Sequence, residues 1–269
     1  MNIQSSLQAV AAAAVAVMVA APAQAAPITD WNYILTGVWS ARTPTSGINV
    51  SGDQKTLSWG SGGTNSSLVI GADQNGSVQT QITGASPQAG STAAGLTLTH
   101  NNNVLPSTAP TLAGATLTAT LILDPSNPDY SPFPPTSLSY NILFEETTNA
   151  TPCAAASPSG NPCNDIFVQT SGFLNQTLTF LDQTYYINIF PINGGLLSTL
   201  SNSACQAAGA PNGCIGFTTI ENQSNTLSFG FTISTERFVN NVPEPGTLAL
   251  LGAALLGAGA ASRRRKLRQ

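Results

Sequence analysis

Apolar and polar residues alternate along most of the chain, which is the pattern of strands that are buried on one face. The alternation is clearest at residues 117–123, 138–144 and 227–233. Shorter segments of the same kind are 33–39, 56–59, 68–71, 78–83, 96–99, 166–170, 177–181, 185–190 and 217–221. Because no helical periodicity occurs between Pro27 and Val242, we predict an all-β fold, an antiparallel β-sandwich of the jelly-roll type.

Turn-forming residues separate the predicted strands. Asn75-Gly76 favours a type I′ hairpin turn that joins residues 68–71 to residues 78–83. Long loops, at residues 124–136 and around the cysteines, are expected at the ends of the sandwich.

The N-terminal end differs from this β-rich body. Residues 9–21 are an uninterrupted apolar run, which is followed by Ala23-Gln24-Ala25. Small residues at the third and first positions before a cleavage point suit signal peptidase, so we place cleavage after Ala25. The stretch before the apolar run lacks Lys and Arg, which departs from the usual pattern. We interpret residues 1–25 as a signal peptide rather than as an N-terminal core helix.

The C-terminal end combines a stiff joint, an uncharged segment and a basic cluster. These parts are Pro243, Glu244 and Pro245; residues 247–261; and Arg263, Arg264, Arg265 and Lys266. A helix over the fifteen uncharged residues would be roughly 22 Å long, short of a hydrocarbon core of about 30 Å. The basic cluster should stay cytoplasmic, which places the body at the outer face of the inner membrane. A simple permanent anchor is the other interpretation.

This tripartite arrangement resembles the PEP-CTERM sorting signal. The resemblance implies that exosortase, a membrane-embedded cysteine protease and transpeptidase, cuts near Pro243-Glu244-Pro245. The body would then pass from transient anchoring in the inner membrane to the cell surface or the extracellular matrix. The resemblance also implies a Gram-negative bacterium that makes extracellular polysaccharide or biofilm. The signal covers about a tenth of the chain and says nothing about the activity of the body.

Charge is distributed unevenly between the body and the tail. Five of the eight basic residues lie in the tail, which leaves Arg42, Lys55 and Arg237 in residues 26–245 against all twelve acidic residues. An acidic body without a basic patch repels phosphate, so we predict no nucleic-acid partner.

Four cysteines occur as two local pairs, Cys153 with Cys163 and Cys205 with Cys214. An even number of cysteines in an exported chain favours disulfides. Local pairing is the simplest of the three connectivities that four cysteines allow. A zinc site is the rival interpretation, but the spacing is wide and the only histidine is distant.

The segment Thr99-His100-Asn101-Asn102 resembles the signature of the THxN family of PEP-CTERM proteins, in which Thr99, His100 and Asn102 are the defining positions. Three further stretches are similar to that family: Trp59-Gly60, Glu146-Thr147-Thr148-Asn149 and Cys163-Asn164-Asp165-Ile166-Phe167. Together they span most of the body. The family has no established activity, so the resemblance classifies the chain without assigning chemistry.

Candidate catalytic residues are few. His100 is the only histidine, so a Ser-His-Asp mechanism would need it, but the chain has no Gly-x-Ser-x-Gly motif. A structural polar cluster at a strand end explains His100 better. Glu145, Glu146 and Asp165 offer carboxylates for a glycosidase pair, yet adjacent glutamates on a strand point to opposite faces, and no spacing supports a pair of Glu146 with Asp165. We predict no enzymatic activity.

Two binding functions are alternatives to a structural one. Residues 73–76, residues 124–129 and Asp165 offer oxygen ligands for a structural calcium ion, but none of them is a complete calcium loop. Trp31, Trp39 and Trp59 would form a platform for stacking on sugars, or else belong to the core. No other cofactor or metal is expected.

The sequence thus predicts a signal peptide at residues 1–25, one β-sandwich domain at 26–241 and a sorting signal at 242–269. We expect a non-enzymatic surface or matrix protein, with signal peptidase and exosortase as processing partners. Extracellular polysaccharide is the material with which it would associate. A carbohydrate-binding module, with or without a requirement for calcium, is the alternative, and a secreted hydrolase is the third interpretation.

Both ends should be absent from the exported protein. Its intact mass is expected to match a chain that begins at Ala26 and ends near residues 243–245, because signal peptidase and exosortase would act at those points. Mass spectrometry of the secreted form checks this. A mature protein that keeps Arg263, Arg264 and Arg265 would contradict the predicted processing.

Overall fold

The computed structural model describes residues 26–147, 149, 151–155, 163–170, 174–192 and 198–238. The predicted signal peptide and sorting signal lie outside these residues, and so do Pro243, Glu244, Pro245 and the basic cluster. Within the described residues, no helix has the length and apolar character needed to cross a membrane.

The described chain is mostly β, which confirms the predicted class. Each predicted strand overlaps an observed one. The strands are β1 (Asp30–Thr43), β2 (Asn49–Val50), β3 (Thr56–Ser61), β4 (Thr64–Ile70), β5 (Gln74–Gln81), β6 (Ala93–Asn102), β7 (Gly114–Asn127), β8 (Thr136–Glu145), β9 (Asp165–Gln169), β10 (Gln176–Phe180), β11 (Gln183–Ile192), β12 (Ser198–Thr199), β13 (Ile215–Thr219) and β14 (Gln223–Ser234).

The strands form one large mixed sheet that does not close. Its hydrogen-bonded path runs β12-β13-β9-β8-β7-β1-β5-β14-β6-β4-β3-β2, and β11, which also pairs with β10, joins it through β14. The pairs are antiparallel except β5 with β14, which are parallel where Thr80 faces Ile233 and Gln81 faces Ser234. The predicted purely antiparallel arrangement is therefore corrected, since alternation shows which face of a strand is buried but not which strands pair.

Strand β5 joins the two halves of the sheet. Besides β14, it pairs with the start of β1 over six residues. The hydroxyl of Thr80 accepts a hydrogen bond from Trp31 Nε1 at 2.8 Å and donates one to the carbonyl of Ile28 at 2.5 Å. Next to it, the buried Gln81 amide donates to the carbonyls of Thr83, Gly84 and Ser86. The chain passes here from pairing with β1 to pairing with β14. The side chains of Thr80 and Gln81 give hydrogen-bond partners to polar groups that would otherwise be unpaired at this point.

The predicted hairpin turn at Asn75-Gly76 is wrong. Both residues lie inside β5, opposite Ile34 and Tyr33 of β1. Strand β4, the expected partner of β5, pairs with β3 and β6 instead. The Tyr33 ring packs on Gly76, where an added Cβ would lie 3.3 Å from Cε1. The glycine therefore serves a close approach across two strands rather than a turn.

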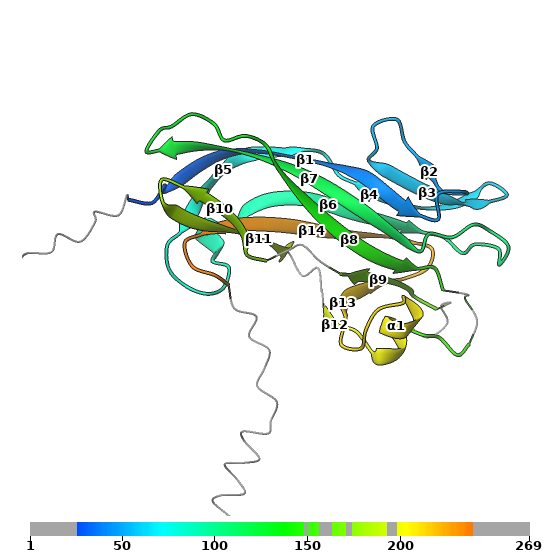
Figure 1. The fold of residues 1–269 in the computed structure, drawn as a ribbon. Helices are drawn as coiled ribbons and strands as arrows, with labels where there is room; N and C mark the ends of the chain where they lie inside the picture. Colours follow the sequence, from blue (N-terminus) through cyan, green and yellow to red (C-terminus); the bar gives the residue numbers. More distant parts are fainter. Residues whose placement is uncertain are drawn as a thin grey trace, which may run out of the picture.

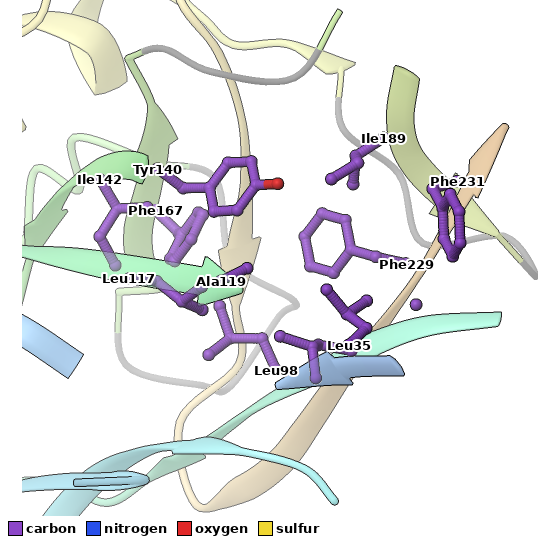
Figure 2. A pocket seen from close by; sticks show the side chains of 12 residues that line it. Leu35, Leu98, Leu117, Ala119, Tyr140, Ile142, Phe167, Ile189, Phe229 and Phe231 are labelled. Carbon is purple, nitrogen blue, oxygen red and sulfur yellow. The ribbon is translucent and has the colours of Figure 1, made fainter. Parts of the chain in front are cut away.

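The core lies between the two halves of the sheet. Strands β1 and β7 run above β6 and β14 in Figure 1, and β8 descends across the view from the level of β7 toward β9. The ring of Tyr33 in β1 meets that of Phe231 in β14 edge-on, with 4.8 Å between ring centroids. Figure 2 shows Tyr140 and Phe167 of one half directed toward Ile189 and Phe229 of the other, around an apolar gap of about 40 Å³. The alternating apolar positions of the sequence thus meet face to face.

Two disulfides join Cys153 to Cys163 and Cys205 to Cys214, which confirms the local pairing. Cys205 of the second disulfide lies in a helix that alternation did not predict, α1 (Asn202–Ala207). This helix lies beside β12 and β13 in Figure 1. Ser201 caps this helix, since its hydroxyl accepts a hydrogen bond from the amide of Ala204 at 3.2 Å. Six residues are too few to show helical periodicity. A single 3₁₀ turn, η1 (Ala89–Ser91), precedes β6.

Two neighbours in β1 distinguish the inward face from the outward one. Leu35 is 3% exposed and Ile34 is 48% exposed. Leu35→Ala is expected to lower the free energy of unfolding by about 2–5 kcal/mol, because it leaves a cavity between the two halves. Ile34→Ala should lower it by no more than about 1 kcal/mol. Urea unfolding of both variants checks the assignment, and equal losses would contradict it.

Candidate functional site

Polar residues continue the inward face where several strands end. In β6 the buried positions Leu96 and Leu98 are followed by His100 and Asn102, which are also buried. The same succession occurs at the ends of two other strands: Phe144 of β8 is followed by the buried Glu146, and the half-buried Phe217 of β13 is followed by the buried Thr219 and Glu221. Period-two geometry therefore directs these polar side chains into the interior.

The ends of β6 and β8 meet the start of β9 in a cluster of ionisable side chains. His100, Glu146 and Asp165, the first residue of β9, each place one potential ligand atom within 4.8 Å of the other two. Their exposures are 1%, 9% and 0%. In the part of the chain that the structure describes, this is the one group of three or more such residues with that spacing.

The imidazole of His100 is held between aromatic rings. It stacks on the ring of Trp59 at 5.8 Å between centroids and meets Phe144 edge-on at 5.0 Å. Its Nδ1 atom lies 2.8 Å from the hydroxyl of Thr219, while the buried Nε2 has no hydrogen-bond partner. Burial lowers the pKa of His100 to about 3, so the ring is neutral at physiological pH.

Each of the two carboxyl groups has one oxygen that is held and one that is not. Trp59 Nε1 donates to Glu146 Oε2 at 2.7 Å, and the amide of Thr147 donates to Asp165 Oδ1 at 2.8 Å. The other oxygens, Glu146 Oε1 and Asp165 Oδ2, are buried without a partner. Glu221 stands near both, and the side chain of Asn149 hydrogen-bonds to its carboxyl group.

The cluster strongly favours the neutral forms of its acids. Burial is the main reason that the pKa values of Glu146 and Asp165 lie well above their usual range. Repulsion adds to this effect, from Glu221 on Glu146 and from Glu146 on Asp165. Burial also raises the pKa of Glu221. The sequence had offered no spacing that would support a pair of Glu146 with Asp165, and the structure brings the two together.

The remaining residues of the THxN-like motif take different positions. Asn102 is buried, and its amide donates to the carbonyl of Thr219 at 3.3 Å, while its Oδ1 has no partner. Thr99 faces the other side of β6, where its hydroxyl lies 2.9 Å from that of Thr226. Glu145 also points away from the cluster, as expected for adjacent residues of a strand, and lines a separate cavity of about 100 Å³ with Thr147.

The three tryptophans belong to the core, as one of the two interpretations expected, and do not form a sugar-stacking platform. Trp31, Trp39 and Trp59 are all buried. Each indole nitrogen donates inward: Trp31 to Thr80, Trp39 to the carbonyl of Lys55 at 3.1 Å, and Trp59 to Glu146. Alternation places all three rings on the inner face of their strands, so they are part of the hydrophobic core.

The stretches considered for calcium do not converge. Asp73 forms an ion pair with Lys55 at 2.6 Å. Asp124 lies in β7, opposite Asn32 of β1. Within the described residues, only Asp165 of these candidates belongs to a group with metal-ligand spacing, and its neighbours there are His100 and Glu146.

Comparison with known proteins identifies the C-terminal end. Residues 241–266 match the PEP-CTERM protein-sorting motif. No curated protein matches the chain. The match includes Pro243, Glu244 and Pro245 together with the basic cluster, so the chain carries a PEP-CTERM sorting motif. The motif implies processing by exosortase and a location at the cell surface.

The hydroxyl of Thr219 provides the polar contact of the His100 Nδ1 atom. Thr219→Val keeps the shape of the side chain but leaves a buried ring nitrogen unpaired, so it should lower the free energy of unfolding by about 1–3 kcal/mol. Thr177→Val in β10 is the matched control, because Thr177 is exposed. Urea unfolding of both variants is the measurement. A Thr219 variant as stable as the control would show that the contact contributes nothing.

Proposed function

We propose that the body is a non-enzymatic structural protein of the cell surface or extracellular matrix, associated with exopolysaccharide or biofilm. The observation that carries this proposal is the PEP-CTERM motif at residues 241–266, which sends the chain to the surface. The two disulfides support it, because such bonds persist in oxidising compartments outside the cytoplasm.

The outer face of β1, β7 and β8 supports association with a hydrated polymer. Hydroxyl and amide groups there bond to one another across strands. Ser40 lies 2.7 Å from the Thr118 hydroxyl, and Thr116 donates to Asn141 at 2.9 Å. Such groups exchange hydrogen bonds with sugar hydroxyls and with water at little net cost. A broad polar face suits many weak contacts with a polymer.

The buried state of the His100 cluster supports a structural role over catalysis. Its ionisable groups are enclosed by Trp59, Phe144 and Thr219, and the contact of the His100 Nδ1 atom is with a threonine rather than a serine. General acid–base catalysis needs the acid or base within hydrogen-bond reach of a substrate. We also propose that the chain belongs to the THxN family, since His100 and Asn102 are both buried and both contact Thr219.

The location of the mature protein tests the proposal. In cells with exosortase, the processed form should fractionate with extracellular polysaccharide. Without exosortase, the chain should stay in the membrane fraction at a mass that retains the basic cluster. In cells that have exosortase but do not synthesise the polysaccharide, the processed protein should appear free in the medium. Processed protein that stays free in the medium even when polysaccharide is present would overturn the matrix role.

A further inference from the structure

The buried cluster lacks a described cation that would compensate its acids. The body has three basic residues, and each has another partner. Arg42 Nε donates to the carbonyl of Ile48, Lys55 pairs with Asp73, and Arg237 lies over the Tyr186 ring. Burying several carboxyl groups without a positive charge is costly unless they stay protonated or bind a metal ion.

We propose that His100, Glu146 and Asp165 bind one divalent first-row transition-metal ion inside the exported body. Zn²⁺ is the representative ion for testing. This inference goes beyond the surface role proposed above and does not depend on it.

The hydrogen bonds of the cluster hold one polar atom of each residue and leave a second polar atom of each without a partner. His100 Nδ1 is held by Thr219, Glu146 Oε2 by Trp59 and Asp165 Oδ1 by Thr147. The atoms left over, Nε2, Oε1 and Oδ2, are buried and unpartnered. Metal ligands in proteins show this division, in which an outer group fixes one atom so that the other faces the metal.

The protonation states also suit a metal ion. A neutral imidazole has a free lone pair, and burial keeps His100 neutral. A dication that displaces the protons of Glu146 and Asp165 would balance their two negative charges. Glu221 lies close enough to repel both carboxylates and is a further oxygen donor beside these ligands. One nitrogen and two carboxylate oxygens with a fourth oxygen donor form an ordinary tetrahedral set.

The ligand types favour a transition metal over calcium. Calcium takes six to eight oxygen ligands, whereas imidazole nitrogen suits zinc, iron and related ions. All four cysteines are in disulfides, so no thiolate competes within the described residues. At the tetrahedral angle, two zinc ligands at about 2.1 Å from the metal lie roughly 3.4 Å apart. The observed spacing of up to 4.8 Å therefore needs each side chain to move inward by roughly 1 Å.

A metal at this position would connect the two halves of the open sheet. His100 belongs to β6, in the half that contains β14, while Glu146 and Asp165 belong to the half that contains β8 and β9. His100 faces Asn225 of β14, and the β5 junction faces Ile233 of the same strand. Eight residues of a strand span about 27 Å, so the ion would bind the halves together far from their hydrogen-bonded junction.

The test uses the full exported protein, purified without chelator and analysed for metal by mass spectrometry. One transition-metal ion per chain is expected. After chelation, Zn²⁺ should rebind with the same stoichiometry and raise the melting temperature, and Ca²⁺ should not. Absence of a stoichiometric metal together with absence of Zn²⁺ binding would overturn the proposal. A preference for Ca²⁺ would overturn the assigned class of ion.

Isosteric variants locate the site. Glu146→Gln and Asp165→Asn keep the shape of the cluster and should weaken Zn²⁺ binding at least tenfold. Trp59→Phe removes the hydrogen bond to Glu146 and shortens the ring that stacks on His100, and it should weaken binding by about 10–100-fold. Asp73→Asn is the control, since Asp73 is a carboxylate at the surface, and it should bind as the parent does. Full Zn²⁺ affinity in both cluster variants would contradict the site, and circular dichroism shows that each variant is folded.

Discussion

The parallel pairing of β5 with β14 is the contact on which the rest of the structure depends. Through it, the strands led by β1 and the strands led by β14 become one sheet instead of two. The apolar faces of the halves then enclose a common core, in which Tyr33 meets Phe231. Thr80 and Gln81 make this change of direction feasible, because their side chains satisfy the polar groups around it.

The buried polar cluster occupies the opposite end of the same core. There the inward faces of β6, β8 and β13 change from apolar to ionisable residues, and Trp59 and Phe144 shield them from water. A protein that only needed stability would be served as well by apolar residues of similar volume. The polar residues therefore favour a specific role, either in selecting this arrangement of strands or in holding an ion between them.

Address and body are separate parts of this protein. The PEP-CTERM motif at residues 241–266 implies the route of export, while the disulfides, the polar outer face and the acidic charge describe what is delivered. None of these features depends on an open catalytic cleft. Disulfides benefit an exported protein, because they slow its unfolding outside the cell, where no chaperone refolds it.

Much of the local structure was predictable from the sequence, because alternation is a local property. The faces of β7, β8 and β14, both disulfides and the sorting signal were all predicted correctly. The turn at Asn75-Gly76 and the absence of helices were predicted wrongly. Turn propensity at Asn75-Gly76 yielded to pairing with β1, and α1 is too short to show a period.

What the sequence determined by itself is therefore which residues face inward and how the chain is addressed. His100 and Glu146 could have been assigned inward positions by extending the alternation of β6 and β8 by one step. Their meeting with Asp165 was decided by the tertiary structure alone. It depends on which strands pair and on how the open sheet folds over its core, and these follow from long-range packing that no local pattern records.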